Sequence, residues 1–163
     1  MMSESRAENN FILARSQEHK LILETLADME ACLKFSSSRE LIHNLRNLIE
    51  PFKSKFDLHQ RLEEQVIFTA GLQVIPSENV VSLVLQLQKE HGIFEHTIDS
   101  LSEKLWNFPE DDGTRISIQR ELEKLILNIK KHSLLEVTNL FPVLSKNPKC
   151  KQLIDTYSAK IQI

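Results

Sequence analysis

The chain is poor in the residues that interrupt helices. It contains only 3 Gly and 5 Pro among 163 residues, which argues against a turn-rich β fold and favours an all-helical one. Hydrophobic residues make up 41% of the sequence, so a disordered chain is excluded too. A chain of this length is expected to bury its core unaided, and we treat residues 1–163 as a single domain with a core at about 8–145.

Several functional classes find no support in the composition. The net charge is −3, the pI is about 6.1, and the longest cationic block is Lys130-Lys131, so neither nucleic acid nor an anionic membrane is expected as a partner. No apolar run approaches the about 18 residues of a membrane helix. Nothing near the first residue resembles a secretory signal, and we expect a cytoplasmic protein. The two cysteines, Cys32 and Cys150, predict neither a disulfide framework nor a thiolate metal site.

Familiar catalytic patterns are missing as well. The sequence has no nucleophile–base arrangement, no Gly-rich phosphate loop and no dinucleotide fingerprint. Hydrolase, kinase and dehydrogenase functions therefore lack support. Whether the protein is an enzyme is left open, and any catalysis would depend on bound metal.

Apolar residues recur at helical spacing in four long segments. They predict helices at about 8–35, 38–70, 78–107 and 114–140, with a short tail helix after Pro148. Long helices joined by short connections favour an antiparallel up-down-up-down four-helix bundle.

Helix starts and ends are marked by local signals. Ser5-x-x-Glu8 and Ser37-x-x-Glu40 fit the capping box, in which each side chain satisfies the backbone N–H group of the other residue. We expect Gly71 to end the second helix in a left-handed conformation. We expect Pro142 to end the fourth, and Pro51 to kink or break the second helix.

Polar residues interrupt the apolar stripe of every predicted helix. Each helix places one histidine on its inward face, and the second and fourth helices add a glutamate one turn later. By the same spacing His43 and His96 should lie on the surface. The inward set is His19, His59, Glu63, His91, His132 and Glu136.

One pattern occurs twice. Residues 59–68 read HQRLEEQVIF and residues 132–141 read HSLLEVTNLF, so both contain His-x-x-x-Glu-x-x-x-x-Phe. A third His-x-x-x-Glu pair is His91 with Glu95. Any single inward histidine is typical of an ordinary core residue, and a lone pair of this kind is often only an i,i+4 contact.

The combination predicts a metal site. Four imidazoles and two carboxylates in one apolar layer would cost several kcal/mol per unpaired charge, and a bound cation removes that cost. Six nitrogen and oxygen ligands without thiolate exceed what one tetrahedral zinc uses and suit two iron or manganese ions bridged by carboxylates.

The order His19, His59-x-x-x-Glu63, His91, His132-x-x-x-Glu136, followed by Leu-Phe-Pro, resembles the hemerythrin HHE cation-binding family over roughly residues 15–145. The resemblance implies an oxo- or hydroxo-bridged di-iron centre, although the residues leave manganese and zinc open. It implies that both glutamates bridge, that His19 and His59 serve one iron, and that His91 and His132 serve the other. Phe68 and Phe141 are expected to close the apolar end of the pocket.

The sequence departs from the oxygen-carrying members of that family at two positions. They have a histidine where this chain has Glu95, and an aspartate where it has Val137. A set of four histidines and two glutamates instead resembles the iron-sulfur-centre repair and nitric-oxide-response branch. Glu95 is thus an additional candidate ligand, an outer base or a solvated surface residue.

Three functions follow from the resemblance. The leading one is a cytoplasmic di-iron protein that reacts with O2, NO, peroxide or related reactive species in sensing, stress response or iron-centre repair. The repair branch often carries a further cysteine-bearing N-terminal domain, which this sequence does not show. The alternatives are a reversible O2 carrier and a metal-dependent iron sensor that acts through a protein partner. Neither the partner nor the oligomeric state can be inferred from the sequence.

Overall fold

The structure, a computed structural model, describes residues 10–161, and these are almost entirely helical. This confirms the predicted all-α bundle with a tail helix. The elements are α1 (Asn10–Phe35), α2 (Ser38–Leu62), the π-helix η1 (Glu63–Phe68), α3 (Thr69–Val74), α4 (Glu78–Asn107), α5 (Asp112–Leu135), the π-helix η2 (Glu136–Leu140), α6 (Phe141–Ser145) and α7 (Pro148–Lys160).

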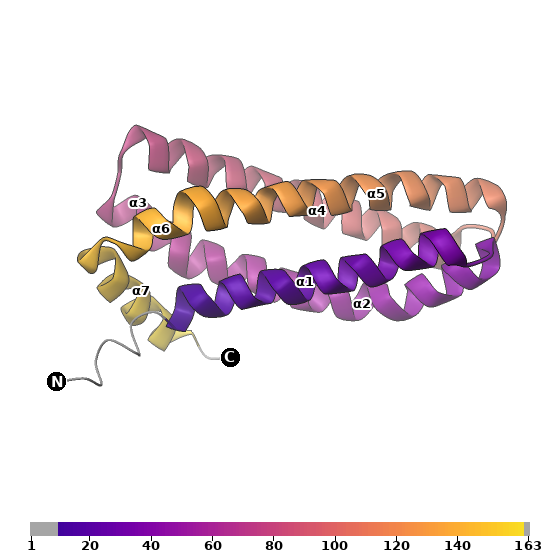
Figure 1. The fold of residues 1–163 in the computed structure, drawn as a ribbon, viewed down its shortest axis with the longest axis horizontal. Coiled ribbons are helices and arrows are strands. Elements are labelled where there is room, and N and C mark those ends of the chain that lie inside the picture. Colours follow the sequence, from indigo (N-terminus) through magenta and orange to yellow (C-terminus); the bar gives the residue numbers. More distant parts are fainter. Residues whose placement is uncertain (1–9, 162–163) are drawn as a thin grey trace.

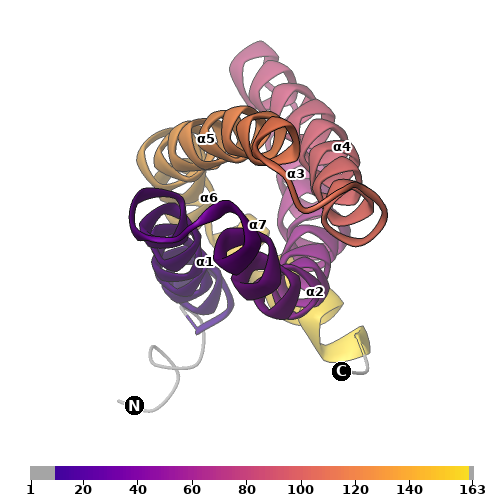
Figure 2. The same cartoon turned by 90° about the vertical axis from the view of Figure 1, so that its right-hand side faces the viewer.

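Four long helices run side by side along the length of the molecule (Figure 1). Helix α1 packs against α2, α2 against α4, α4 against α5, and α5 against α1, which closes the ring seen end-on in Figure 2. The turns after α1 and α4 lie together at one end, and α7 lies across the other end, against α3, α6 and η1. Within the described residues no helix is long and apolar enough to cross a membrane.

The predicted cap of the second helix is confirmed. Ser37 accepts a hydrogen bond from the Glu40 backbone N–H, and the Glu40 side chain accepts one from the Ser37 N–H. Ser77 and Asp111 cap α4 and α5 in the simpler one-sided way. The other predicted capping box, at Ser5 and Glu8, lies outside the described residues.

Two predicted helix ends are wrong. Gly71 does not take a positive φ angle, and the helical path continues through it to Val74. Pro142 does not end the last long segment, because α6 continues to Ser145. Pro142 lies in the first turn of α6, directly after the wide π turns of η2, where a missing backbone N–H costs least. Pro51 lies inside α2, which is not broken there.

The apolar core is divided in two by the polar residues predicted above. A loop-end cluster, next to the turns after α1 and α4, includes Leu26, Leu45, Ile98 and Leu122. A tail-end cluster, under α7, includes Phe68, Val84, Leu140, Leu144 and Ile154. The inward histidines and glutamates lie between these clusters along every long helix.

Gly71 packs closely against a neighbouring side chain, whereas Gly92 does not. A Cβ atom on Gly71 would lie 3.1 Å from Leu144 Cδ2, but one on Gly92 would meet nothing within 4 Å. We therefore expect Gly71→Leu to lower the free energy of unfolding by about 1–3 kcal/mol. The matched variant Gly92→Leu should leave it unchanged or raise it by up to about 1 kcal/mol. Urea unfolding of both variants checks this, and equal stability of the two would contradict the packing assigned to Gly71.

Candidate metal centre

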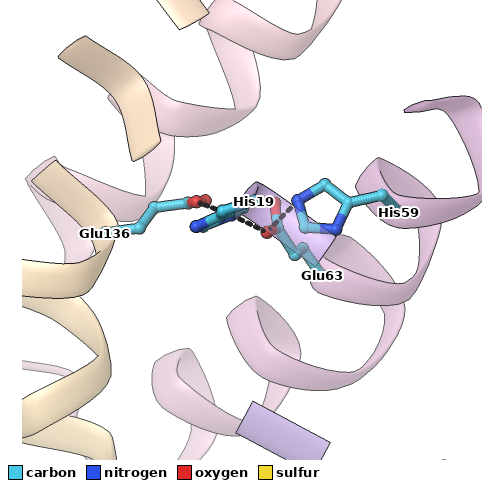
Figure 3. A group of neighbouring side chains, drawn as sticks. All are labelled: His19, His59, Glu63 and Glu136. Carbon is cyan, nitrogen blue, oxygen red and sulfur yellow. Dashed lines mark hydrogen bonds and ion pairs between the residues drawn. The ribbon is translucent and has the colours of Figure 1, made fainter. Parts of the chain in front are cut away.

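The six predicted residues converge inside the bundle. The four histidines come one from each long helix, and the two glutamates are the first residues of η1 and η2. Glu63 and Glu136 are 0% exposed, and the histidines are 3–5% exposed. Figure 3 shows His19 between the two carboxylates, with His59 beside Glu63.

Each carboxylate faces histidines on both sides. Glu63 Oε1 lies 2.7 Å from His59 Nε2 and 3.2 Å from His19 Nε2, while Glu63 Oε2 lies 3.2 Å from His91 Nε2. Glu63 thus presents one oxygen to each pair of imidazoles.

Glu136 repeats this arrangement from the other side of the bundle. Its Oε2 lies 2.9 Å from His19 Nε2 and its Oε1 lies 3.2 Å from His132 Nε2. The result is two groups of four residues that share both glutamates. Within each group, one potential ligand atom per residue lies within 4.8 Å of the others. The first is His19, His59, Glu63 and Glu136, and the second is Glu63, His91, His132 and Glu136.

Both glutamates stand where an α-helix widens into π turns. Segments η1 and η2 begin at Glu63 and Glu136, and such turns are frequent at functional sites. The widening changes the direction in which the residues after each glutamate point, so Phe68 and Phe141 are also buried. The sequence does not predict these turns, because the hydrophobic spacing there also fits an ordinary α-helix.

Buried phenylalanines line the histidines. Phe68 stacks on His91 with ring centroids 5.5 Å apart, and Phe141 stacks on His19 at 5.8 Å. Phe94 meets His132 edge-on at 5.2 Å. Phe68 and Phe141 thus each cover one face of an imidazole, as the predicted role of closing the pocket requires.

Three further carboxylates, which were not predicted from the sequence, contact the outer nitrogens of three of the histidines. Glu18 lies 2.5 Å from His59 Nδ1, Glu64 lies 2.8 Å from His91 Nδ1, and Glu90 lies 2.6 Å from His132 Nδ1. An ionised carboxylate only accepts, so each of these Nδ1 atoms carries a proton, and in the neutral imidazole Nε2 is the acceptor directed at the cluster.

A sequence signal for these carboxylates did exist. Each of the three is the immediate neighbour in sequence of an inward residue, but each contacts a histidine of a different helix. That pairing depends on how the helices pack, which spacing within one helix does not show. Glu18 is itself held by Arg15, whose Nη2 lies 2.6 Å from its second oxygen.

The charges in the cluster shift its titration. Burial alone would lower the pKa of His19, but Glu136 and Glu63 more than offset it and raise the pKa to about 9. Burial likewise opposes protonation of His59 and His91, whose neighbouring carboxylates raise their pKa to about 9. Burial would raise the pKa of Glu63, yet the imidazoles around it hold that pKa well below its ordinary value.

The donor set fits a cation. Among the described residues, Glu63 Oε2 and both oxygens of Glu136 have no hydrogen-bond partner, although imidazole nitrogens lie 2.9–3.2 Å away. These atoms are near one another without the alignment of donor and acceptor. Unsatisfied buried carboxylate oxygens are costly, and imidazole nitrogen with carboxylate oxygen is a common ligand set for iron, manganese and zinc.

The remaining candidates lie outside the cluster. Glu95 is exposed and belongs to neither group of four. It lines a polar hollow of about 570 Å³ together with Glu64 and His91. His43 and His96 are exposed, as their positions on the helices predicted.

A ring of four long helices around a buried layer of histidine and glutamate defines a cation-binding helical bundle. A family model, the hemerythrin HHE cation binding domain, matches residues 15–144. The chain belongs to this family, which confirms the predicted resemblance at that level. Comparisons with curated proteins and with solved structures found no match.

The raised histidine pKa values predict how the metal-free protein responds to pH. Protonated imidazoles balance the buried carboxylates, so this stabilisation is complete below pH 6.5 and is lost as the pH rises through about 9. The free energy of unfolding in the presence of a chelator should therefore fall over that interval, by up to about 1.4 kcal/mol per pH unit for each of these histidines. Urea unfolding between pH 6 and 9.5 measures it.

Two comparisons sharpen this measurement. His43→Gln replaces an exposed histidine and should leave the pH dependence unchanged. Metal-loaded protein should show no such fall, because a cation and protons compete for the same nitrogens and deprotonation favours the cation. A metal-free protein whose stability rises between pH 6.5 and 9 would contradict the electrostatics described here.

Proposed function

We propose that the cluster holds two iron ions and that the protein reacts with O2, NO, peroxide or related reactive species in sensing, stress response or iron-centre repair. The supporting observation is the pair of overlapping groups that share both carboxylates. One ion would be held by His19 and His59, the other by His91 and His132, with Glu63 and Glu136 bridging. Manganese and zinc use similar ligands and are outcomes of the metal analysis.

The chain's own residues fit such a role. Bound iron would supply the electrons that a diatomic molecule or a peroxide takes up. Aromatic rings cover part of the histidine faces, and the outer carboxylates hold the proton of three imidazoles on Nδ1. His19 also lines a surface hollow of about 700 Å³ between α1 and α5, bordered by Leu134 and Val137, through which a small uncharged molecule can approach.

Metal stoichiometry tests the assignment of ligands. After anaerobic reconstitution with ferrous iron, the wild-type protein should contain about two ions per chain by elemental mass spectrometry. His59→Ala should retain about one ion, because it removes a ligand of one position only. Glu63→Ala should weaken both positions, because its two oxygens face both pairs of histidines.

Glu95→Gln is the matched control for these variants. It removes an exposed carboxylate on the helix that carries His91, and it should still hold about two ions. Loss of an ion from Glu95→Gln would make Glu95 a ligand. Equal partial occupancy in His59→Ala and Glu63→Ala would refute the bridging role of Glu63.

Reactivity is tested separately on the reduced, iron-loaded protein. Addition of O2, NO or peroxide should change the near-ultraviolet and visible absorption spectrum of the iron. A spectrum that is restored over repeated cycles of O2 addition and removal would favour an oxygen carrier. The absence of any change with all three molecules would rule out the proposed reactivity while leaving metal binding intact.

A further inference from the structure

The outer hydrogen bonds of the four imidazoles are unequal. His59, His91 and His132 each have a carboxylate at Nδ1. The Nδ1 atom of His19 is buried and has no hydrogen-bond partner among the described residues, although the residue is only 4% exposed. One pair of histidines thus has two outer carboxylates, and the other pair has one.

The repeated sequence shows which position of the chain lacks the fourth outer carboxylate. Aligning residues 59–68 with 132–141 pairs His59 with His132, Glu63 with Glu136 and Phe68 with Phe141. The stacking contacts follow the same alignment, because Phe68 lies on His91 while Phe141 lies on His19. The α1–α2 half and the α4–α5 half are therefore related by an approximate internal two-fold symmetry.

Among the outer carboxylates, the symmetry breaks at one position. Glu64, which contacts His91, aligns with Val137. Val137 lines the same hollow as His19, where the symmetry would place a partner for His19 Nδ1. Both positions reach the surface, since Glu64 is partly exposed and Val137 is exposed. Glu18 and Glu90 complete the symmetry, because each immediately precedes one inward histidine and contacts the next along the chain.

An outer carboxylate has a definite effect on a ligating histidine. It fixes the proton on Nδ1, holds the ring orientation and makes Nε2 a stronger donor to a metal; its loss typically weakens metal affinity 10- to 100-fold. Without such a partner, no hydrogen bond from the described residues holds the proton of His19 on Nδ1, and the contact of its Nε2 with Glu63 Oε1 favours the proton on Nε2 in the metal-free protein.

We propose that Val137 makes the two metal positions unequal, so that the ion at His19 and His59 is held less tightly and leaves before the ion at His91 and His132. Glu18, Glu64 and Glu90 act as positioning residues through the imidazoles they contact. This inference rests on the proposed function only in requiring that the cluster holds two ions.

The test measures ion release rather than reactivity. Protein loaded anaerobically with ferrous iron is counted for metal and then mixed with excess chelator, and release is followed by absorbance. The wild type should release its iron in two phases of about one ion each. His59→Ala, which lacks the weaker position, should show the slow phase alone.

Reciprocal variants then exchange the two halves. Val137→Glu supplies His19 with a carboxylate and should slow the fast phase by about 10-fold or more. Glu64→Val removes the carboxylate from His91 and should accelerate the slow phase by a similar factor. The double variant should reverse the order in which the two positions lose their ions.

Controls separate positioning from general effects. Val137→Gln has the same length as Val137→Glu without the charge and should slow release much less. Glu95→Gln removes an exposed carboxylate outside the cluster and should leave both phases unchanged. Thermal melts of the metal-free variants report on folding. A folding defect would accelerate both phases of ion release together, whereas each reciprocal variant should change only one phase.

The possible results are distinct. Two bound ions released in a single phase that neither reciprocal variant splits or shifts would overturn the inequality and leave the dinuclear centre intact. No slowing in Val137→Glu together with an unchanged slow phase in Glu64→Val would refute the role of these positions. Failure of the wild type to bind two ions would instead refute the proposed function on which the inference rests.

Discussion

Two carboxylates buried at zero exposure are the constraint on which the rest of this structure depends. A desolvated negative charge is stable only when positive charge or good donors surround it. The bundle supplies one imidazole from each long helix, and three further carboxylates balance three of those imidazoles in turn. Glu63 and Glu136 are thus surrounded by imidazoles, and three imidazoles are in turn contacted by further carboxylates. These side chains can meet only if the four helices keep their relative positions along the bundle axis.

The same constraint explains the local irregularities of the helices. The helical path widens at Glu63 and again at Glu136, and the aromatic ring five residues later stacks on a histidine in both halves. The repeated sequence thus forms the same local structure in both halves of the bundle. Val137 departs from this repeat, and the departure is informative because the neighbouring phenylalanine contacts are equivalent in the two halves.

The fold and the inner cluster were predictable because both depend on spacing within a single helix. The inward set from His19 to Glu136 interrupts apolar stripes at helical intervals, so each member could be placed before the helices were assembled. The outer carboxylates, such as Glu18 and Glu90, lie toward the polar faces and contact another helix, which no single-helix pattern shows. The ends predicted at Gly71 and Pro142 failed for a related reason: α3, α6 and α7 pack together there, and tertiary contacts outweighed the local signals.

The division of the apolar core has a consequence for how the molecule comes apart. The loop-end and tail-end clusters are separate, and the histidine–glutamate layer is what lies between them. Cooperativity between two hydrophobic cores depends on the coupling through the layer that joins them. A cation bound in this layer would be held by residues from all four long helices and would couple the two clusters, whereas without it the two ends would open more independently. Amide hydrogen exchange would then register metal content as a difference in protection between the two ends of the same helices.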